Sequence, residues 1–415
     1  QPAAEENYTR HVDPKIGTGG HGHVFVGANV PFGMVQVGPT SIPQTWDWCS
    51  GYHASDSTVI GFSHTHLSGT GIGDLFDITV MPVVGEVTYA RGEENDPASG
   101  LWSYADRTRE ITKPGYYSVP LVRYGITAEL TATERVGLHR YTFPASDAAA
   151  VVFDLENGGC WDKATDTGFR FSDDSTRIAG WRCSTGWAKN QEVYFVAEFS
   201  KPAKGISYLQ PGEIDDSKMP RIAARYARVD FDTAEGEQVL VKVALSPVSI
   251  EGAKANLAAE LSGWDFDATA AAADKAWNDE LSKVKIETED ETSKRIFYTA
   301  LYHTMVAPSL FCDVNGDYRG ADGKVHENPG HDTYTTFSLW DTYRAAMPLM
   351  TVLHPERMPD IIQTMLHIAD EQGRLPVWHL WGNETDCMVG NPGIPVVADA
   401  IVKGIGGFDR EKAFE

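Results

Sequence analysis

The stretch EGAKANLAAELSGWDFDATAAAADKAWNDELSKV, residues 251–284, separates two parts of the 415-residue chain that differ in composition. It is rich in Ala, Leu, Glu and Lys, which favour helix, so it predicts a helical linker over residues 251–285. We expect a two-sheet β-sandwich before it, over residues 1–250, and the start of a helical barrel after it, over residues 286–415. The predicted fold class is therefore a multidomain β + α chain.

The part before the linker consists of short apolar or alternating runs bounded by clusters of Gly, Pro, Asn and Asp. No long helical period interrupts them, and many strands with long connections are typical of a sandwich. The clearest strands are predicted at Ile78–Val84, Tyr117–Tyr124, Ala148–Leu155, Glu192–Phe199 and Val239–Leu245.

The part after the linker has helical periodicity. Ile296, Phe297, Ala300, Leu301 and Met305 are predicted to share one helix face. Further helices are predicted over about 336–352, 355–373 and 394–402, with Asp409 as the cap of another. Because the last residues read as helix, we expect the chain to be a fragment or one piece of a longer polypeptide. Successive helices with long aromatic loops predict a site at one end of a barrel.

The net charge of −23 excludes several classes of partner. Nucleic acids need a basic groove, and anionic membrane surfaces attract basic segments. No run of about twenty apolar residues could span a bilayer.

The first residues, QPAAEENYTR, are compatible with a mature end left by signal removal, which predicts a periplasmic, secreted or cell-surface protein. In such a compartment Cys160 and Cys183 could form a bridge, or they could be ordinary thiols.

The stretch IGTGGHGHVFVGANVPFGM, residues 16–34, contains Gly17-x-Gly19-x-x-Gly22, the spacing of a dinucleotide-binding loop. Such a loop needs a strand before it and a helix after it. Pro14 precedes it, and β-branched residues and Pro31 follow, which argues against a nucleotide site. The glycines instead predict a tight turn whose backbone approaches a ligand closely.

Two histidine pairs, His21-x-His23 and His64-x-His66, could each present two imidazoles on one side of a strand. A catalytic zinc usually has three protein ligands, and neither His-Glu-x-x-His nor Cys-x-x-Cys occurs. Hydrogen bonding by these histidines is therefore favoured, and no metal ligand is predicted in this chain. A His-based metal-dependent hydrolase stays as a less favoured alternative.

Three stretches combine Trp with carboxylates and amides: QTWDWCSGYH at 44–53, TTFSLWDTYR at 335–344 and PVWHLWGNETDCMVGNPG at 376–393. A sugar presents an apolar ring face and a ring of hydroxyls, so its site needs an aromatic surface beside hydrogen-bonding groups. Each stretch alone is also compatible with core packing. Together, in an acidic chain, they favour a carbohydrate site.

Two carboxylates in these stretches are candidates for contact with a sugar. Asp341 could accept from two vicinal hydroxyls while Arg344 keeps it ionised, or the two could form an ordinary intrahelical ion pair. Glu384 could be a general acid or only a hydroxyl acceptor. Glycoside hydrolysis normally uses a second carboxylate on the opposite face of the ring, and the sequence does not pair Glu384 with one.

Five ordered motifs resemble glycoside hydrolase family 92, the bacterial exo-acting α-mannosidases, over a match from about Val12 to the last residue. They are DPKIGTGGHGHVFVGANVPFGMVQVGPT, WDWCSGYH, IGFSHTHLSGTG, FSLWDTYR and GNETDCMVG. The resemblance implies an N-terminal β-sandwich, a helical linker and a C-terminal (α/α)6 barrel. It also implies a calcium-dependent, inverting enzyme that removes terminal mannose from α-mannosides such as N-glycans, often at α-1,2 linkages.

The resemblance also implies where substrate is bound. Asp341 and the Gly20–His21 backbone are expected to contact the terminal mannose, with the sandwich domain reaching the barrel mouth through the glycine loop. The implied substrate-binding residues are Gly19, Gly20, His21, Asp47, Trp48, Cys49, Trp340, Asp341 and, nearby, Glu384.

The family's acidic motifs of the kind Glu-Gly-Asn, Gly-Asn-Glu-Pro and Gly-Asn-Asp-Asp-Cys-Gly do not occur in this chain. The resemblance therefore places the catalytic acid, the base and most calcium ligands beyond residue 415, in the remainder of the barrel polypeptide. Glu384 is only a candidate proton donor, because its GNET motif has Thr where the family has Pro. A non-catalytic carbohydrate-binding protein is the main alternative.

Overall fold

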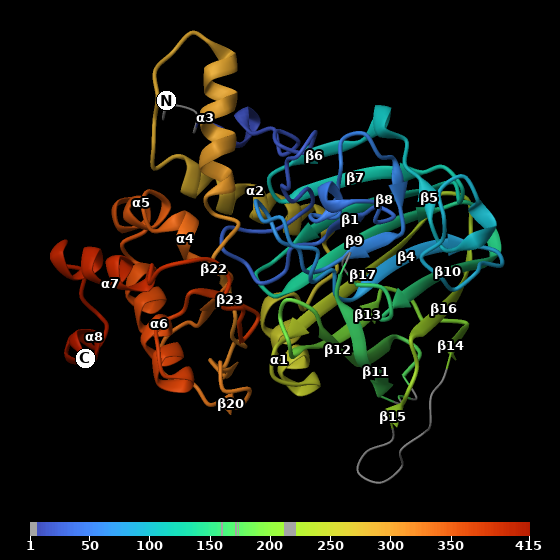
Figure 1. Cartoon of the computed structure of the whole chain (residues 1–415). Coiled ribbons are helices and arrows are strands. Elements are labelled where there is room, and N and C mark those ends of the chain that lie inside the picture. Colours follow the sequence, from blue (N-terminus) through green and yellow to red (C-terminus); the bar gives the residue numbers. More distant parts are fainter. Residues whose placement is uncertain (1–5, 159–160, 171, 173, 211–220) are drawn as a thin grey trace.

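The computed structural model describes residues 6–158, 161–170, 172, 174–210 and 221–415. Figure 1 shows a β-rich N-terminal domain followed by a smaller helical part that lies beside it. All pairings between neighbouring strands of the two large sheets are antiparallel. The predicted fold class, a β-sandwich followed by the first helices of a barrel, is confirmed.

The N-terminal domain contains two large sheets. The six-stranded sheet has the order β1 (Gly38–Thr40), β3 (Gly61–Ser63), β4 (Thr79–Val84), β10 (Ser146–Asp154), β16 (Tyr226–Thr233) and β14 (Gly205–Leu209). The nine-stranded sheet has the order β15 (Arg221–Ile222), β11 (Lys163–Arg170), β12 (Arg177–Thr185), β13 (Gln191–Phe199), β17 (Glu237–Ser246), β9 (Val136–Phe143), β8 (Ile126–Ala132), β7 (Tyr116–Leu121) and β6 (Ile111–Lys113).

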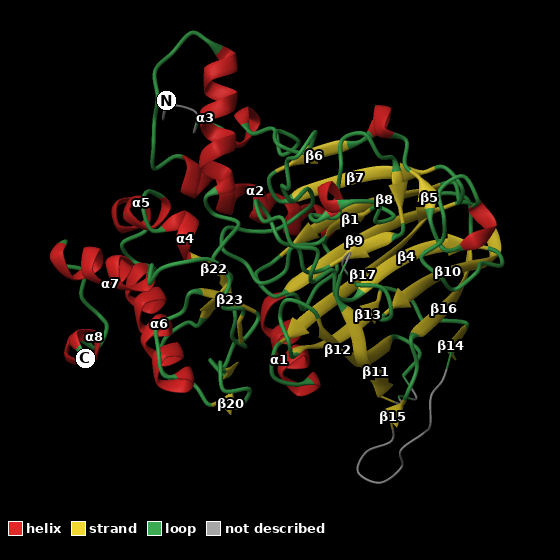
Figure 2. Cartoon of the chain, in the orientation of Figure 1, coloured by secondary structure: helices red, strands yellow, loops and turns green. Residues whose placement is uncertain are grey.

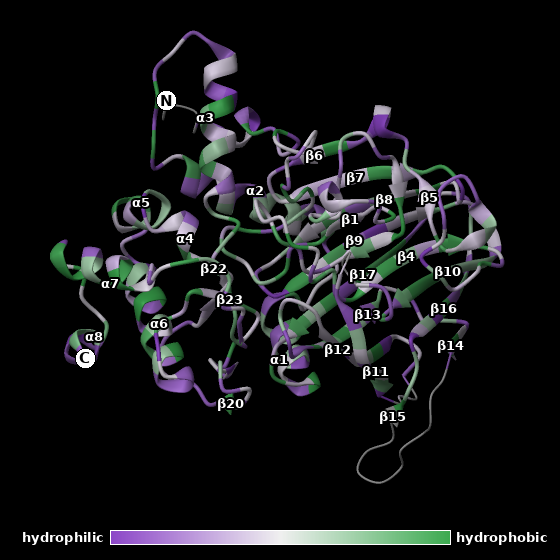
Figure 3. Cartoon of the chain, viewed as in Figure 1, coloured by the Kyte–Doolittle hydropathy of each residue, from purple (hydrophilic) through white to green (hydrophobic). Residues whose placement is uncertain are grey.

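The two sheets enclose one apolar core. Strands β4 and β10 are largely hydrophobic (Figure 3), and most of their residues are buried in the middle of the domain. The ring of Phe153 on β10 stacks on Phe195 of β13, with centroids 5.9 Å apart, so the sheets face each other. Each of the five strands predicted above corresponds to an observed strand.

The helical part follows the last sandwich strand (Figure 2). Its helices are α1 (Ile250–Glu260), α2 (Phe266–Leu281), α3 (Glu291–His303), α4 (Leu339–Thr342), α5 (Ala346–Leu353), α6 (Met358–Gln372), α7 (Gly393–Val402) and α8 (Arg410–Phe414). A small sheet of β22 (Phe337–Ser338), β23 (Trp378–Leu380) and β24 (Asn383–Glu384) lies among them. The remaining short strands are β2 (Thr58–Val59), β5 (Ser103–Tyr104), β18 (Ser309–Leu310), β19 (Tyr318–Arg319), β20 (Val325–His326) and β21 (Tyr334–Thr335).

Helix α1 connects the sandwich to the helical part through buried polar groups. The Asn256 side chain donates to the Leu245 carbonyl at 2.8 Å and to Asp313 Oδ1 at 2.9 Å, and it accepts from the Val314 amide at 2.9 Å. Ser246 donates to the other oxygen of Asp313 at 2.8 Å. Because buried polar groups are stable only when they are paired, this network fixes the first barrel segment against the sandwich.

Two details of the helix prediction are wrong. The predicted 336–352 helix is broken into β22, α4 and α5, because Pro348 has no amide hydrogen to donate to the Arg344 carbonyl of a continuous helix. On α3 the predicted face is rotated, since Ile296 is 58% exposed whereas Tyr298 and Tyr302 are buried. These two tyrosines pack on Tyr8 and Trp277, which lie far away in sequence.

Cys160 lies outside the described residues, so the structure does not choose between a bridge to Cys183 and ordinary thiols. Among the described residues, no helix combines the length and apolar character needed to cross a membrane.

Candidate functional site

The glycine loop and the Trp-Asp-Trp stretch lie together. His21 Nδ1 is 2.9 Å from Asp47 Oδ1, and His23 Nε2 is 3.6 Å from the same oxygen. The hydrogen bond from His21 is the largest factor that lowers the pKa of Asp47, whereas burial lowers the pKa of His23. His23 Nε2 is buried and forms no hydrogen bond within 3.5 Å among the described residues, so Asp47 is its nearest charged neighbour.

Gly20 and Trp48 join the same cluster through His53. His53 Nε2 donates to the Gly20 carbonyl at 3.0 Å, and its ring stacks on Trp48 at 4.4 Å. The backbone at Gly20 is left-handed, with φ +58°. A Cβ at Gly22 would collide with the Gly17 carbonyl oxygen, which explains the glycine-rich turn by close backbone approach.

The aromatic surface of this cluster comes from Trp46, a neighbour of the predicted residues. Its indole is 48% exposed and lies edge-on to His23 at 4.2 Å. Cys49, by contrast, is fully buried and donates its thiol to the Trp46 carbonyl. Trp46 is therefore better placed than Trp48 or Cys49 to meet a sugar ring.

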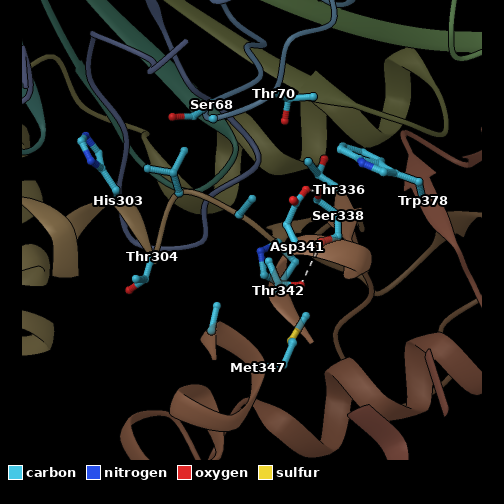
Figure 4. Close-up of a pocket in the computed structure, with 15 residues that line it drawn as sticks. Ser68, Thr70, His303, Thr304, Thr336, Ser338, Asp341, Thr342, Met347 and Trp378 are labelled. Carbon is cyan, nitrogen blue, oxygen red and sulfur yellow. Dashed lines mark hydrogen bonds between the residues drawn. The ribbon is translucent and has the colours of Figure 1, made fainter. Parts of the chain in front are cut away.

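The segment from Ser68 to Gly71 connects this cluster to a cavity. Trp46 Nε1 donates to the Gly71 carbonyl at 2.9 Å, and the Gly69 amide donates to the His23 carbonyl at 2.5 Å. On its other side the segment lines a cavity of about 300 Å³ between the sandwich and the helical part (Figure 4). The polar residues that line this cavity are Ser68, Thr70, His303, Thr304, Thr336, Ser338, Asp341 and Thr342.

Asp341 is the carboxylate that lines this cavity. It lies in the first turn of α4, where the Ser338 hydroxyl donates to its Oδ2 at 2.5 Å. Arg344 donates instead to the Tyr343 hydroxyl at 2.8 Å, so the expected support from Arg344 is replaced by Ser338. Trp340 is 39% exposed beside Asp341 but does not line the cavity.

His303, at the end of α3, supplies a polar nitrogen at the opposite side of the cavity from Trp378 (Figure 4). Burial lowers its pKa to about 4, so the imidazole is neutral at pH 7. Its Nε2 is buried with no partner among the described residues. A neutral imidazole can donate or accept, depending on its tautomer.

The cavity wall at Trp378 is held by the sandwich domain. Trp187, in the loop between β12 and β13, packs edge-on against Trp378 with centroids 4.6 Å apart. In the same loop the Asn190 amide donates to Asn383 Oδ1, and Asn383 Nδ2 donates to the Asn190 carbonyl, both at 3.0 Å. One aromatic contact and one paired amide contact therefore set the position of the β23–β24 hairpin.

Glu384 is used by the hairpin itself. Its Oε2 accepts from the Val377 amide at 2.8 Å and from the Gln372 side chain at 3.1 Å. Its Oε1 accepts from the amides of Trp378 at 2.8 Å and Asp386 at 3.1 Å. Four donors around one carboxylate favour a structural role for Glu384 over proton transfer.

The histidines of the rival metal-dependent hydrolase do not form one site. His64 is buried and bonds to the Ile78 carbonyl at 2.6 Å and to His139 at 2.9 Å, and His66 bonds to the Gln36 carbonyl. Within the described chain, none of these four histidines belongs to a three-ligand group that could hold a metal. The metal-hydrolase alternative therefore loses its structural basis.

Several residues of the site were missed by the sequence reasoning. Ser68 and Thr70 belong to the quoted motif IGFSHTHLSGTG, but the sequence did not place that segment against Asp341. Thr336, which also lines this cavity, has a left-handed backbone with φ +65°, and such strain is common at functional sites.

Comparisons with known proteins assign both parts of the chain to one family. Residues 11–246 match the Glycosyl hydrolase family 92 N-terminal domain, and residues 252–415 match the Glycosyl hydrolase family 92 catalytic domain. A secreted glycosidase of uncharacterised activity from Arthroderma benhamiae is 25% identical over 99% of this chain and 52% of its own length.

Two solved structures from Bacteroides thetaiotaomicron are similar. A family GH92 α-mannosidase in complex with mannoimidazole is 38% identical, with a TM-score of 0.93 over 99% of this chain and 55% of that protein. A family GH92 inverting mannosidase is 28% identical, with a TM-score of 0.85 over 100% of this chain and 55% of that protein. The chain thus spans about half the length of the relatives that it matches.

Proposed function

Because the chain belongs to glycoside hydrolase family 92, we propose that it forms the sugar-binding part of an exo-acting α-mannosidase. The substrate would be a mannose-containing glycan, with α-1,2-linked mannose of N-glycan-type mannosides as the preferred linkage. The observation that carries the proposal is the cavity between Ser68–Thr70 of the sandwich and Asp341 of α4. Its volume of about 300 Å³ and its hydroxyl-rich lining match one sugar ring.

Each group in the cavity has a role in binding. Asp341, acceptor-only when ionised, would take hydrogen bonds from two vicinal hydroxyls. The hydroxyls of Thr336 and Ser338 and the neutral imidazole of His303 would bond to further hydroxyls, and Trp378 would cover the apolar ring face. These contacts orient the terminal sugar and exclude water, so they lower the entropy cost of the later chemical step.

The proposed reaction is a single displacement with inversion. It needs an acid and a base on opposite faces of the ring, about 6.5–9.5 Å apart. Asp341 is the carboxylate that the described residues bring to the cavity, and Glu384 is held by four donors. We therefore propose that the acid and the base lie outside residues 1–415, in the remainder of the barrel polypeptide.

Calcium assistance is part of the proposal, but the residues of this chain do not make a calcium site by themselves. Calcium takes six to eight oxygen ligands, and the cavity offers a single carboxylate. Most calcium ligands would come from the proposed remainder of the barrel polypeptide. When bound, the ion would supply positive charge for the sugar hydroxyls.

We also propose export to the periplasm, the cell surface or the medium, because one relative is a secreted glycosidase.

The test is hydrolysis of an aryl α-mannoside by the intact polypeptide, with product stereochemistry followed by NMR. We expect β-mannose as the first product, loss of turnover with a chelator, and recovery with Ca²⁺. Residues 1–415 alone are expected to give no turnover. Turnover by residues 1–415 alone, or α-mannose as the first product, would overturn the assignment of roles.

One observation is also compatible with a second candidate function, that of a non-catalytic carbohydrate-binding protein. The described cavity contains one carboxylate and no acid–base pair. Such a protein would bind mannosides without calcium-linked turnover even as the intact polypeptide, so the same assay separates the two.

A further inference from the structure

A second polar cluster lies at the β19–β20 hairpin, away from the cavity. It consists of Asp322 and His326 on the hairpin and Glu371 near the end of α6. One donor atom from each lies within 4.8 Å of the other two. His326 Nε2 is 3.0 Å from Asp322 Oδ1. Three side chains from two elements thus direct two oxygens and one nitrogen toward one point.

Gly320 shows how closely these atoms converge. A Cβ at position 320 would lie less than 3.0 Å from Glu371 Oε2, Asp322 Oδ1 and His326 Nε2 at once. No other amino acid fits at this position without moving all three donors. The three donor atoms therefore converge directly on the Gly320 backbone, and only glycine allows so close an approach.

The donors are also held from outside. The Tyr318 hydroxyl donates to Glu371 Oε1 at 2.9 Å, and the Ala321 amide donates to Oε2 at 2.8 Å. The Tyr318 ring stacks on His326 at 5.1 Å. Metal ligands are commonly oriented by such outer contacts, and here they fix both Glu371 and the imidazole.

The charge of the cluster distinguishes it from a similar one. The other three-ligand group of the described chain consists of Glu280, His354 and Glu356. There Lys283 Nζ lies 2.7 Å from Glu280 and 3.2 Å from Glu356, so an ammonium group already offsets part of the negative charge. Within the described residues, no Lys or Arg forms an ion pair with Asp322 or Glu371. Two carboxylates thus face each other with only an imidazole between them.

We propose that Asp322, His326 and Glu371 bind a divalent transition-metal cation, with Zn²⁺ as the best match. Zinc accepts mixed imidazole and carboxylate ligands, whereas calcium prefers oxygen alone. The ion would join the hairpin to α6 and neutralise both carboxylates. It would be separate from the calcium of the proposed reaction.

The test is calorimetric titration of the tag-free protein with ZnCl₂, together with Co²⁺ absorption spectra. We expect one saturable site with a visible Co²⁺ band, and a rise in Tm with Zn²⁺. Asp322→Asn and His326→Ala should each weaken binding by more than about 100-fold, because even outer contacts are worth about 10–100-fold. Glu356→Gln, at the cluster paired with Lys283, should leave binding unchanged.

Three results would overturn the site. They are the absence of saturable Zn²⁺ binding, Zn²⁺ affinity in Asp322→Asn and His326→Ala as high as in the wild type, and displacement of Zn²⁺ by equimolar Ca²⁺. Circular dichroism of both variants checks that the hairpin change leaves the fold intact. None of these readouts depends on mannoside turnover.

Discussion

Trp187 of the sandwich packs edge-on against Trp378 of the cavity wall, with ring centroids 4.6 Å apart. Trp378 lines the cavity and Trp187 does not. The N-terminal domain therefore contributes to the proposed sugar-binding cavity in two ways, directly through Ser68 and Thr70 and indirectly through Trp187.

Replacing Trp187 by Leu should release Trp378 and weaken binding of methyl α-mannoside about fivefold to tenfold, since an aromatic pair is worth about 1 kcal/mol beyond its buried area. Calorimetry gives the affinity. Trp187→Phe should recover most of the affinity. Trp181→Leu is the control, because Trp181 packs instead against the apolar cluster that contains Ile250 and Leu257 of α1. If all three variants bind alike, Trp187 has no positioning role.

Replacing Gly20 by Ala should weaken methyl α-mannoside binding while the fold stays intact. No atom lies within 4 Å of the new Cβ, so the expected cost comes from the left-handed backbone at φ +58°, about 1 kcal/mol for a residue with Cβ. Relaxation of that strain would move the carbonyl that His53 binds. Gly263→Ala, in open space between α1 and α2, is the matched control. Unchanged affinity in Gly20→Ala would contradict the proposal that the glycine loop takes part in mannoside binding.

Replacing Glu384 by Ala should lower the free energy of unfolding by about 2 kcal/mol or more, because the amides that it accepts from lose their charged partner. Glu384→Gln, which keeps one carbonyl acceptor, should be intermediate. Thermal unfolding measures both. The structural role fails if Glu384→Ala keeps its Tm yet abolishes turnover of the intact enzyme, since that result identifies a proton donor.

Asp313 should make stability depend on pH. Burial raises its pKa from 3.8 to about 6, so the folded state takes up a proton between pH 7 and pH 5 while the unfolded chain stays ionised. Its contribution is complete below the unfolded pKa and is lost as pH rises through about 6. Between pH 7 and pH 5 the wild type should gain about 1 kcal/mol more than Asp313→Asn in the free energy of unfolding. Urea titrations at both pH values measure this, and equal gains would contradict it.

The sandwich was predictable because its strands are buried apolar runs ended by turn residues, as at Ile78–Val84. The helical part was harder. The face of α3 depends on contacts of Tyr298 with Tyr8 and of Tyr302 with Trp277, and no local period contains such distant partners. The break before α5 could have been read from Pro348, whose missing amide hydrogen forbids a continuous helix.

The site was partly predictable. The motifs placed Gly20, His21, Asp47 and Asp341 in short polar–aromatic stretches, and the first three lie together in the structure. The sequence could not decide which Trp of the Trp-Asp-Trp stretch is exposed. The position of Trp46 depends on its hydrogen bond to the carbonyl of Gly71, which is distant in sequence. It also could not show that Glu384 turns toward backbone amides.

The most direct test of the sugar-binding cavity is calorimetric titration of methyl α-mannoside into the wild type and Asp341→Asn. Asp267→Asn, also in the first turn of a helix but on the surface of α2, is the control. We expect saturable binding that weakens at least about tenfold in Asp341→Asn, because a bond to a charged group is worth about 1.5–3 kcal/mol, and that is unchanged in Asp267→Asn. Equal affinity in all three proteins would contradict the assignment of this cavity to the terminal mannose.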